Sequence, residues 1–457
     1  MNKIILLIAV TVTLSSCGIY TTYHDAEEVP ENLYGENVVT EDTTSIATIG
    51  WRELFTDPYL QSLIEQGLEN NTDLLSAEQR VKEAQATLLS SKLAYLPSFA
   101  FSPSGTITKN NNYSPSTIHT YSLPISASWQ FDLFGNLRNA KRQAQALRDQ
   151  ARDYEQAVRT QVIASIANVY YTLLMLDEQI AISKETAEAS KQTVNSARAL
   201  MKAGQYNEAG VASLEASDLS VLTSLADLEE SLNATQNSMA LLLAETPRYY
   251  VRGKLADQQF TTDVAVGIPL QLLSNRPDVR YAERALESAF YATNAARSAF
   301  YPSITLTGSL GWQNTSSYGS KFGDPIELVS SAVASLTQPL FQRGQLLGQL
   351  KIAKAQQEEA RLSFQQTLLE AGTEVNEALT QYQTAHHKSE LYEKQIAALE
   401  TAYKSTALLM EYGDTNYIEV LSAQQSFLSG RLTQVANRTT EIQGLITLYQ
   451  ALGGGCD

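Results

Sequence analysis

The sequence predicts a mainly α-helical chain that also carries membrane β strands and is built from two internal repeats. Three observations lead to this fold class. The stretch Leu137 to Ala203 contains neither Gly nor Pro, the two strongest helix breakers. Shorter segments before it alternate apolar and polar residues, as half-buried strands do. The same order of patterns returns about 205 residues later, which indicates an internal repeat.

The N-terminus has the pattern of a secretion signal. Residues 1–16 contain a positive residue, Lys3, followed by an apolar run. The four residues that end at Cys17 resemble a bacterial lipobox, which implies that cleavage leaves Cys17 as a lipid-bearing N-terminus. An ordinary signal peptide followed by a chance Cys is the alternative. Residues 17–57 are polar and rich in Thr, Glu and Tyr, and we expect an extended arm there.

The first strands follow a helical segment that begins near Pro58 and ends at Pro97. From Tyr121 to Leu133, apolar residues at odd positions alternate with mostly polar ones. This strand is longer than the roughly 9–11 residues that a tilted membrane strand needs. We expect an exposed loop from Lys109 to Thr120, between this strand and the one before it. A soluble sheet with one buried face would give the same pattern in each strand taken singly.

The long segment Leu137 to Ala203 is predicted to be one helix. It is not a membrane span, because several Arg and Lys residues interrupt it. Its apolar residues recur at steps of three, four and seven, which is typical of a helix that packs along other long helices. For this stretch alone, a coiled-coil rod remains the alternative. A turn is expected at Gly204, and a further helix from about Val211 to Ala244.

The second half repeats the first. Strands are expected from Ser303 to Gln313 and from about Val329 to Leu340, and a second long helix from about Gln349 to Tyr412. The last helix of each half carries a series of residues seven apart. We therefore divide the chain into a signal peptide (1–16), a lipidated arm (17–57), repeat 1 (58–247), a linker (248–268), repeat 2 (269–452) and a C-terminal tail (453–457).

Four strands per chain determine the expected assembly. Four strands cannot close into a barrel, and open edges in lipid would leave backbone groups unpaired. Two copies would give a barrel of about eight strands, and side chains fill the interior of such a barrel. Three copies would give about twelve strands and leave room for water. The Ser- and Thr-rich strand faces favour three. We therefore expect a trimeric twelve-stranded β-barrel continued by a long α-helical barrel, with the lipid on Cys17 placing the helices in the periplasm.

The chain carries the motifs Trp51 to Pro58, Phe131 to Gly135, Gly267-Ile268-Pro269, Asn275 to Arg280, Tyr301-Pro302-Ser303 and Tyr449 to Gly455. In these motifs it resembles the TolC-like outer-membrane efflux channels, in the lipoprotein branch that serves resistance-type pumps. The resemblance implies a passive conduit for small toxic molecules that docks to a periplasmic adaptor (membrane fusion) protein and an inner-membrane resistance-type transporter. A passage for type I protein secretion and a structural lipoprotein are the alternatives.

The family resemblance also assigns a gate. In the family the periplasmic helix tips close the channel, and carboxylates line the constriction. The implied gate residues are Ile418, Glu419, Ser422 and Gln425. Glu419 stands where some members have the first Asp of the gate, and Ser422 where a second Asp is common; an ordinary solvated charge is the other interpretation of Glu419. The tip turns at Gly204 and Gly413 are expected to dock the adaptor.

Composition argues against other functions. The net charge of −16 argues against nucleic acid as a partner, because both would be negatively charged. The four His residues and two Cys residues show no spacing that would chelate a metal ion, so neither a metal site nor a cofactor is expected. No constellation typical of an enzyme is present in the sequence.

Overall fold

The computed structural model describes residues 23, 50–110, 116–258, 260, 276–316, 327–412 and 417–454. The expected lipidation residue Cys17 and the expected turn residue Gly413 lie outside them. The chain splits into two compact units. The first comprises Met1–Glu27, Arg80–Arg152 and Tyr281–Gln365, and the second comprises Glu28–Gln79, Asp153–Arg280 and Gln366–Asp457. Within the described ranges, no helix has both the length and the apolar composition needed to cross a membrane.

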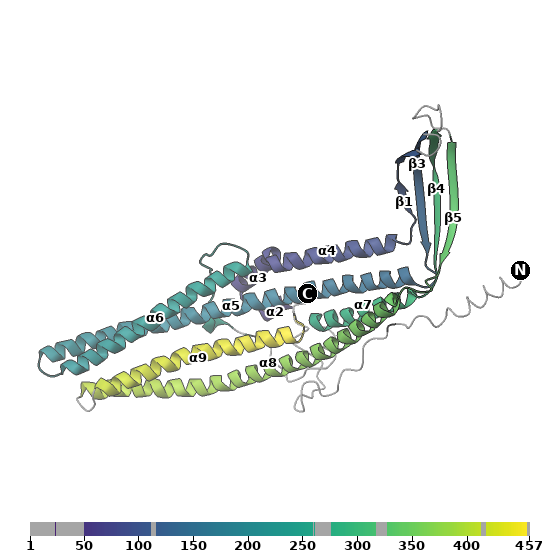
Figure 1. Cartoon of the computed structure of the whole chain (residues 1–457). Helices are drawn as coiled ribbons and strands as arrows, with labels where there is room; N and C mark the ends of the chain where they lie inside the picture. Colours follow the sequence, from purple (N-terminus) through teal and green to yellow (C-terminus); the bar gives the residue numbers. More distant parts are fainter. Residues whose placement is uncertain are drawn as a thin grey trace. The chain divides into compact units, whose positions relative to one another are not determined.

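The helices come in pairs of equal length, one member from each half of the chain (Figure 1). Helices α4 and α7 have 22 residues each, α5 and α8 have 67, and α6 and α9 have 35. This equality confirms the internal repeat. The pairs are α4 (Thr72–Leu93) with α7 (Pro277–Ser298), α5 (Asn136–Lys202) with α8 (Gln345–Glu411), and α6 (Glu208–Leu242) with α9 (Tyr417–Ala451).

Local side-chain caps explain where several helices start. A short helix α2 (Trp51–Leu54) precedes α3 (Pro58–Asn70), which Asp57 caps by accepting the Tyr59 amide at 2.9 Å. Asn71 caps α4 by accepting the backbone amides of Asp73 and Leu74 at 3.0 and 3.1 Å. Asp132 accepts two amides at the start of α5. Each cap satisfies amides that have no partner within the helix.

The first unit contains one antiparallel sheet. Strands β1 (Ser98–Phe101) and β2 (Ser104–Asn110) both pair with β3 (Ser116–Phe131), so they act as one interrupted strand. Strand β3 then pairs with β4 (Ser303–Ser316), and β4 with β5 (Glu327–Thr337). Counted in this way, the sheet has the four strands that the sequence predicts.

Two expectations about the strand ends were wrong. Of the loop expected from Lys109 to Thr120, residues 109–110 and 116–120 lie in strands, because the β2–β3 ladder continues to the pair Asn110 and Ser116; residues 111–115 lie outside the described ranges. Thr and Ile are frequent in this part of β3, and β-branched residues favour strands. Strand β5 starts earlier than expected and ends at Thr337, before Pro339, which has no amide hydrogen for a ladder.

The sheet has one apolar and one polar face. On the apolar face Trp129 pairs with Leu306, Ile125 with Leu310 and Leu123 with Trp312. These side chains are exposed to between 36% and 55%. The opposite face carries small polar pairs such as Ser126 with Ser309. An exposed apolar face of this size is typical of a surface that contacts lipid or another protein.

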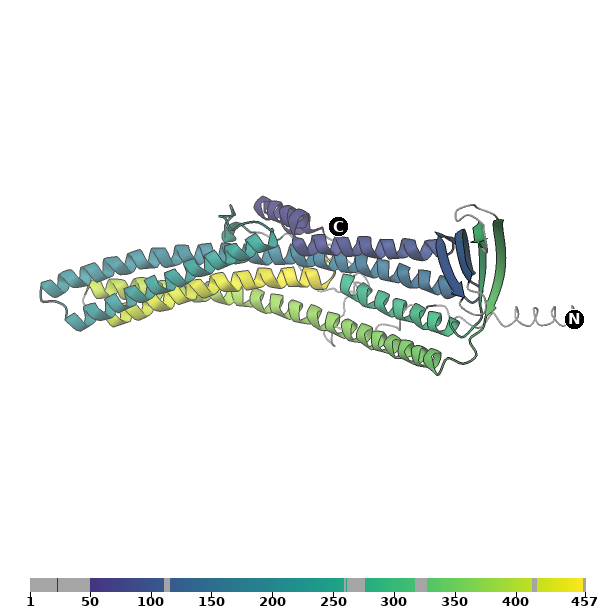
Figure 2. The same cartoon turned by 45° about the horizontal axis from the view of Figure 1, so that its top comes forward.

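In the second unit, parts of α5, α6, α8 and α9 run side by side (Figures 1 and 2). Near the start of α3, a buried hydrogen-bond network joins three segments. The carboxylate of Asp57 accepts the Tyr170 hydroxyl at 2.6 Å and the Gln258 amide at 2.8 Å. Burial and the bond to Asp57 raise the pKa of Tyr170, so its hydroxyl keeps its proton and remains a donor at neutral pH.

Arg276 joins the start of repeat 2 to the end of the chain. Its guanidinium is buried and donates to Asp278 and Glu374 at 2.6 Å, and to the carbonyl oxygen of Ala451 at 2.7 Å. That carbonyl belongs to the last residue of α9, so it has no partner within its own helix. The Arg276 side chain therefore fixes α7, α8 and the end of α9 to one another.

Candidate gate at the helix tips

The turn between α5 and α6 depends on Gly204. The Gly204 amide donates to the Met201 carbonyl at 3.0 Å, and the Gln205 amide to the Leu200 carbonyl at 2.9 Å. These two bonds form a Schellman motif, in which the residue after the helix takes the left-handed conformation. Gly204 has a φ of 73°, which a residue without a Cβ adopts without steric cost. The Asn207 side chain then caps α6 by accepting the Gly210 amide at 2.7 Å.

An apolar cluster joins this turn to the neighbouring helix pair. Its buried members come from α5 and α6, and partly buried side chains from α8 and α9 pack against them. Leu214 of α6 is 3% exposed, and Leu421 of α9 is half-buried on the cluster. The core of the cluster consists of Val194, Ala197, Val211 and Leu214, with Leu200, Met201, Tyr206, Met410 and Leu421 around it. We call these nine residues the tip cluster.

The first turns of α9 have a packed side and an exposed side. Val420 and Gln424 are buried, at 7% and 9% exposure. The four expected gate residues lie on the other side, where Ile418 is 70% exposed and the remaining three are also exposed. Residues three, four and seven apart share one face of a helix, so the four form one stripe. Their role in a gate stays a prediction.

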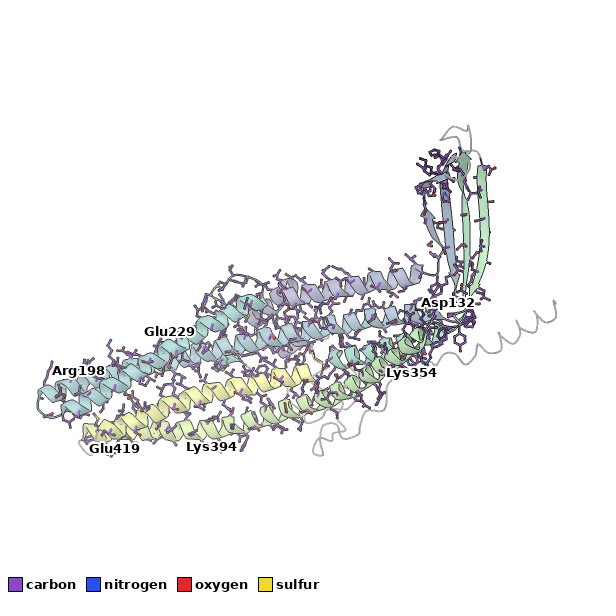
Figure 3. The ribbon with its side chains drawn as sticks, viewed as in Figure 1. Asp132, Arg198, Glu229, Lys354, Lys394 and Glu419 are labelled. Carbon is purple, nitrogen blue, oxygen red and sulfur yellow. The ribbon has the colours of Figure 1, made fainter. Side chains whose placement is uncertain are left out.

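Ion pairs near the tips lie on the surface. Arg198 of α5 and Glu215 of α6 are joined at 2.8 Å, and Lys184 and Glu229 at 3.1 Å, with all four side chains at least 39% exposed. Figure 3 shows Arg198 near the α5–α6 turn and Glu419 at the start of α9. Exposed pairs of this kind contribute about 1 kcal/mol or less each. The apolar contacts of the tip cluster therefore dominate the packing of the tips.

A groove of about 250 Å³ opens beside the tip cluster. Tyr206, Gly210 and Ser213 line it from the α6 side, and Ile418 and Leu421 from the α9 side. The phenol ring of Tyr206 occupies the space that a side chain at position 210 would need. No pattern in the sequence indicates this groove, because the groove depends on the contact between two helices that are distant in the chain.

Comparison with known proteins identifies the family. The family model for outer membrane efflux protein matches residues 63–245 and 268–454, which is most of the chain. The chain belongs to the outer membrane efflux protein family. The cation efflux system protein CusC of Escherichia coli O6:H1 is 27% identical over 458 residues, which cover 98% of this chain and 97% of CusC. The probable outer membrane lipoprotein SilC of Salmonella typhimurium is 26% identical over 439 residues, with 93% of each chain covered.

The likeness extends to the three-dimensional structure. A crystal structure of CusC has a TM-score of 0.86 and 25% identity to this chain, and covers 96% of this chain and 100% of that one. The chain is therefore an outer-membrane efflux channel protein and not an enzyme. The fold class predicted from the sequence, mainly α with membrane strands and two internal repeats, is confirmed. In the described part of the efflux protein, no group of three or more His, Cys, Asp or Glu residues is placed to hold a metal ion.

Proposed function

We propose that this efflux protein works as a homotrimer, with a twelve-stranded β-barrel continued by an α-helical barrel. The observation that carries the proposal is the sheet of the first unit. In the sheet as described, β1 and β2 form one edge and β5 the other, and its apolar face is exposed. Sheet edges in a bilayer need partners, and the strands of neighbouring copies provide them.

In this proposal the helix tips close the channel. Ile418, Glu419, Ser422 and Gln425 of each copy face the axis, and the tip cluster holds the two helix pairs of each copy together. Three Glu419 carboxylates then form a ring that attracts cations and repels anions. Because Ser422 adds no second carboxylate, the ring has one acid per copy and its selectivity is mild. The small side chains on the polar face of the sheet leave the barrel wider than the tips.

We further propose that a periplasmic adaptor protein binds the turns at Gly204 and Gly413 and the groove beside the tip cluster, and that an inner-membrane resistance-type transporter delivers the cargo. The lipid on Cys17 anchors the arm in the periplasmic leaflet of the outer membrane. CusC is named for cation efflux, and a conduit of this kind would carry whatever its transporter delivers.

A mixing experiment tests the trimer. Two forms of the chain that differ only in a C-terminal mass tag are co-expressed, extracted together in detergent and weighed by native mass spectrometry. A trimer gives four species, whereas a dimer gives three and a monomer two. Three or two species would refute the twelve-stranded barrel.

A second experiment tests the docking groove. Ser213→Trp should fill the groove and lower the yield of cross-links to the adaptor. The control is Ser220→Trp, at an exposed position seven residues further along α6, which should leave the yield unchanged. Equal yields from the two variants would show that the adaptor binds elsewhere.

A further inference from the structure

Positive charges collect beside the sheet, although the whole chain has a net charge of −16. Lys and Arg outnumber Asp and Glu in the two segments Arg80–Arg152 and Tyr281–Gln365, which belong to the first unit. The start of α5 contributes the densest group, Arg138, Lys141, Arg142, Arg148 and Arg152, against one acid, Asp149.

Two of these cations lie over aromatic rings, and one of the rings belongs to Tyr95, whose backbone is hydrogen-bonded to Trp129 of the apolar face. Trp129 of that face lies 4.2 Å from Phe131 between ring centroids, and its indole nitrogen donates to the Tyr95 carbonyl at 2.9 Å. The Lys141 ammonium lies 6.0 Å from the centre of the Tyr95 ring. The Arg142 guanidinium lies 5.6 Å from the centre of the Tyr291 ring. We call Tyr95, Trp129, Lys141 and Arg142 the Tyr95 collar.

Asp132, an acid close to Tyr95, already has hydrogen-bond partners. Figure 3 shows Asp132 at the base of the sheet. Its two carboxylate oxygens accept the amides of Leu137 and Arg138 at the start of α5, at 3.1 and 2.8 Å. Burial raises the pKa of Tyr95, and the charge of Asp132 raises it further, whereas Arg138 and Arg142 lower it. One acid and two cations therefore act on the Tyr95 hydroxyl.

Trp and Tyr are enriched where a membrane protein passes from hydrocarbon to headgroups. Lipids whose tails cover Trp129 therefore have their headgroups beside Lys141 and Arg142. We propose that the Tyr95 collar binds the headgroups of anionic phospholipids in the leaflet that meets the helices. Trp129 belongs to the apolar face and not to the Ser- and Thr-rich face, so the collar borders the face that lipid covers and not the aqueous interior. A cation beside an anionic membrane surface strengthens binding about fivefold.

Native mass spectrometry of the full-length protein in detergent tests the proposal. Phosphatidylglycerol is titrated onto the wild type and onto Lys141→Gln/Arg142→Gln, with the zwitterionic phosphatidylcholine as the second lipid. We expect the double variant to bind phosphatidylglycerol about 25-fold more weakly, with phosphatidylcholine binding unchanged. Lys141→Arg/Arg142→Lys should keep the wild-type affinity, because it keeps both charges.

Matched controls decide the other outcomes. Lys388→Gln/Lys394→Gln removes two exposed charges of α8 in the second unit and should leave lipid binding as in the wild type. Equal binding of the two lipids by the wild type would overturn the proposal, as would an unchanged affinity of the Lys141→Gln/Arg142→Gln variant. Competition by soluble glycerol phosphate as effective as that by phosphatidylglycerol would show a site for free phosphate, and would also overturn it.

Discussion

Leu421→Ala should increase the fraction of time that the channel is open. Leu421 is half-buried on the tip cluster and joins α9 to the buried side chains of α5 and α6. The substitution removes three carbon atoms, each of which contributes about 0.8 kcal/mol when fully buried. For a half-buried side chain the loss is about 1 kcal/mol per copy. If three copies open together, the losses sum to about 3 kcal/mol, or roughly a 100-fold shift toward the open state.

Single-channel recording in planar bilayers measures this shift directly. Leu219→Ala is the matched control, because it removes the same atoms from a side chain that is 62% exposed and lies outside the tip cluster. Cells with Leu421→Ala should also admit large antibiotics that the wild type excludes. An open fraction that is the same for Leu421→Ala and Leu219→Ala would show that the tip cluster does not hold the channel closed.

Three further predictions concern charged residues. Glu419→Gln should lower the cation preference measured in a salt gradient, and Glu419→Lys should reverse it. The control Glu230→Gln, at an exposed position, should leave the cation preference unchanged. An unchanged reversal potential in both Glu419 variants would exclude a carboxylate ring. Arg276→Met should lower the free energy of unfolding by about 2 kcal/mol in thermal melts, because the Ala451 carbonyl loses its partner. The control Arg361→Met breaks an exposed ion pair and should lower the free energy of unfolding by less than about 0.5 kcal/mol. Equal losses in the two variants would contradict the role of Arg276. Burial raises the pKa of Glu441, but hydrogen bonds from His386 and Arg438 outweigh it and leave the pKa below the ordinary value of 4.5. Folding therefore favours the ionised form of Glu441. Its contribution to the free energy of unfolding is present above pH 4.5 and disappears as the pH falls through the lowered pKa. In Glu441→Gln the melting temperature should fall less steeply with decreasing pH over this acidic range.

The helices were predictable because their signals are local. The absence of Gly and Pro sets the length of α5, which differs from the predicted segment by one residue at each end. The turn at Gly204 follows from a single residue type, since a left-handed residue after a helix favours Gly. The second long helix starts at Gln345, four residues before the predicted Gln349, and Gly344 with a φ of 81° precedes it.

The packed side of each helix was harder to predict. Heptad spacing shows that Leu214 and Leu421 belong to seams, but not that these two residues pack in the same cluster. Gln424 is buried although its side chain is polar, and no pattern in the sequence distinguishes it from the exposed Gln425. Strand ends depend on cross-strand partners. The lengths predicted for β2 and β3 were therefore too short, because each strand extends the other to the pair Asn110 and Ser116. Contacts between distant segments decide each of these features.

The distribution of charge follows the two environments that an outer-membrane channel meets. Cations lie beside the sheet, where Lys141 and Arg142 stack on aromatic rings, while the second unit contains most of the acids that give the chain its net charge of −16. Lipid headgroups attract the first group and hydrated cations the second. A substitution of Lys141 should therefore affect lipid binding without changing ion selectivity, and a substitution of Glu419 should do the reverse. If either variant alters both properties, the division of the charges between the two units does not separate lipid binding from ion selectivity.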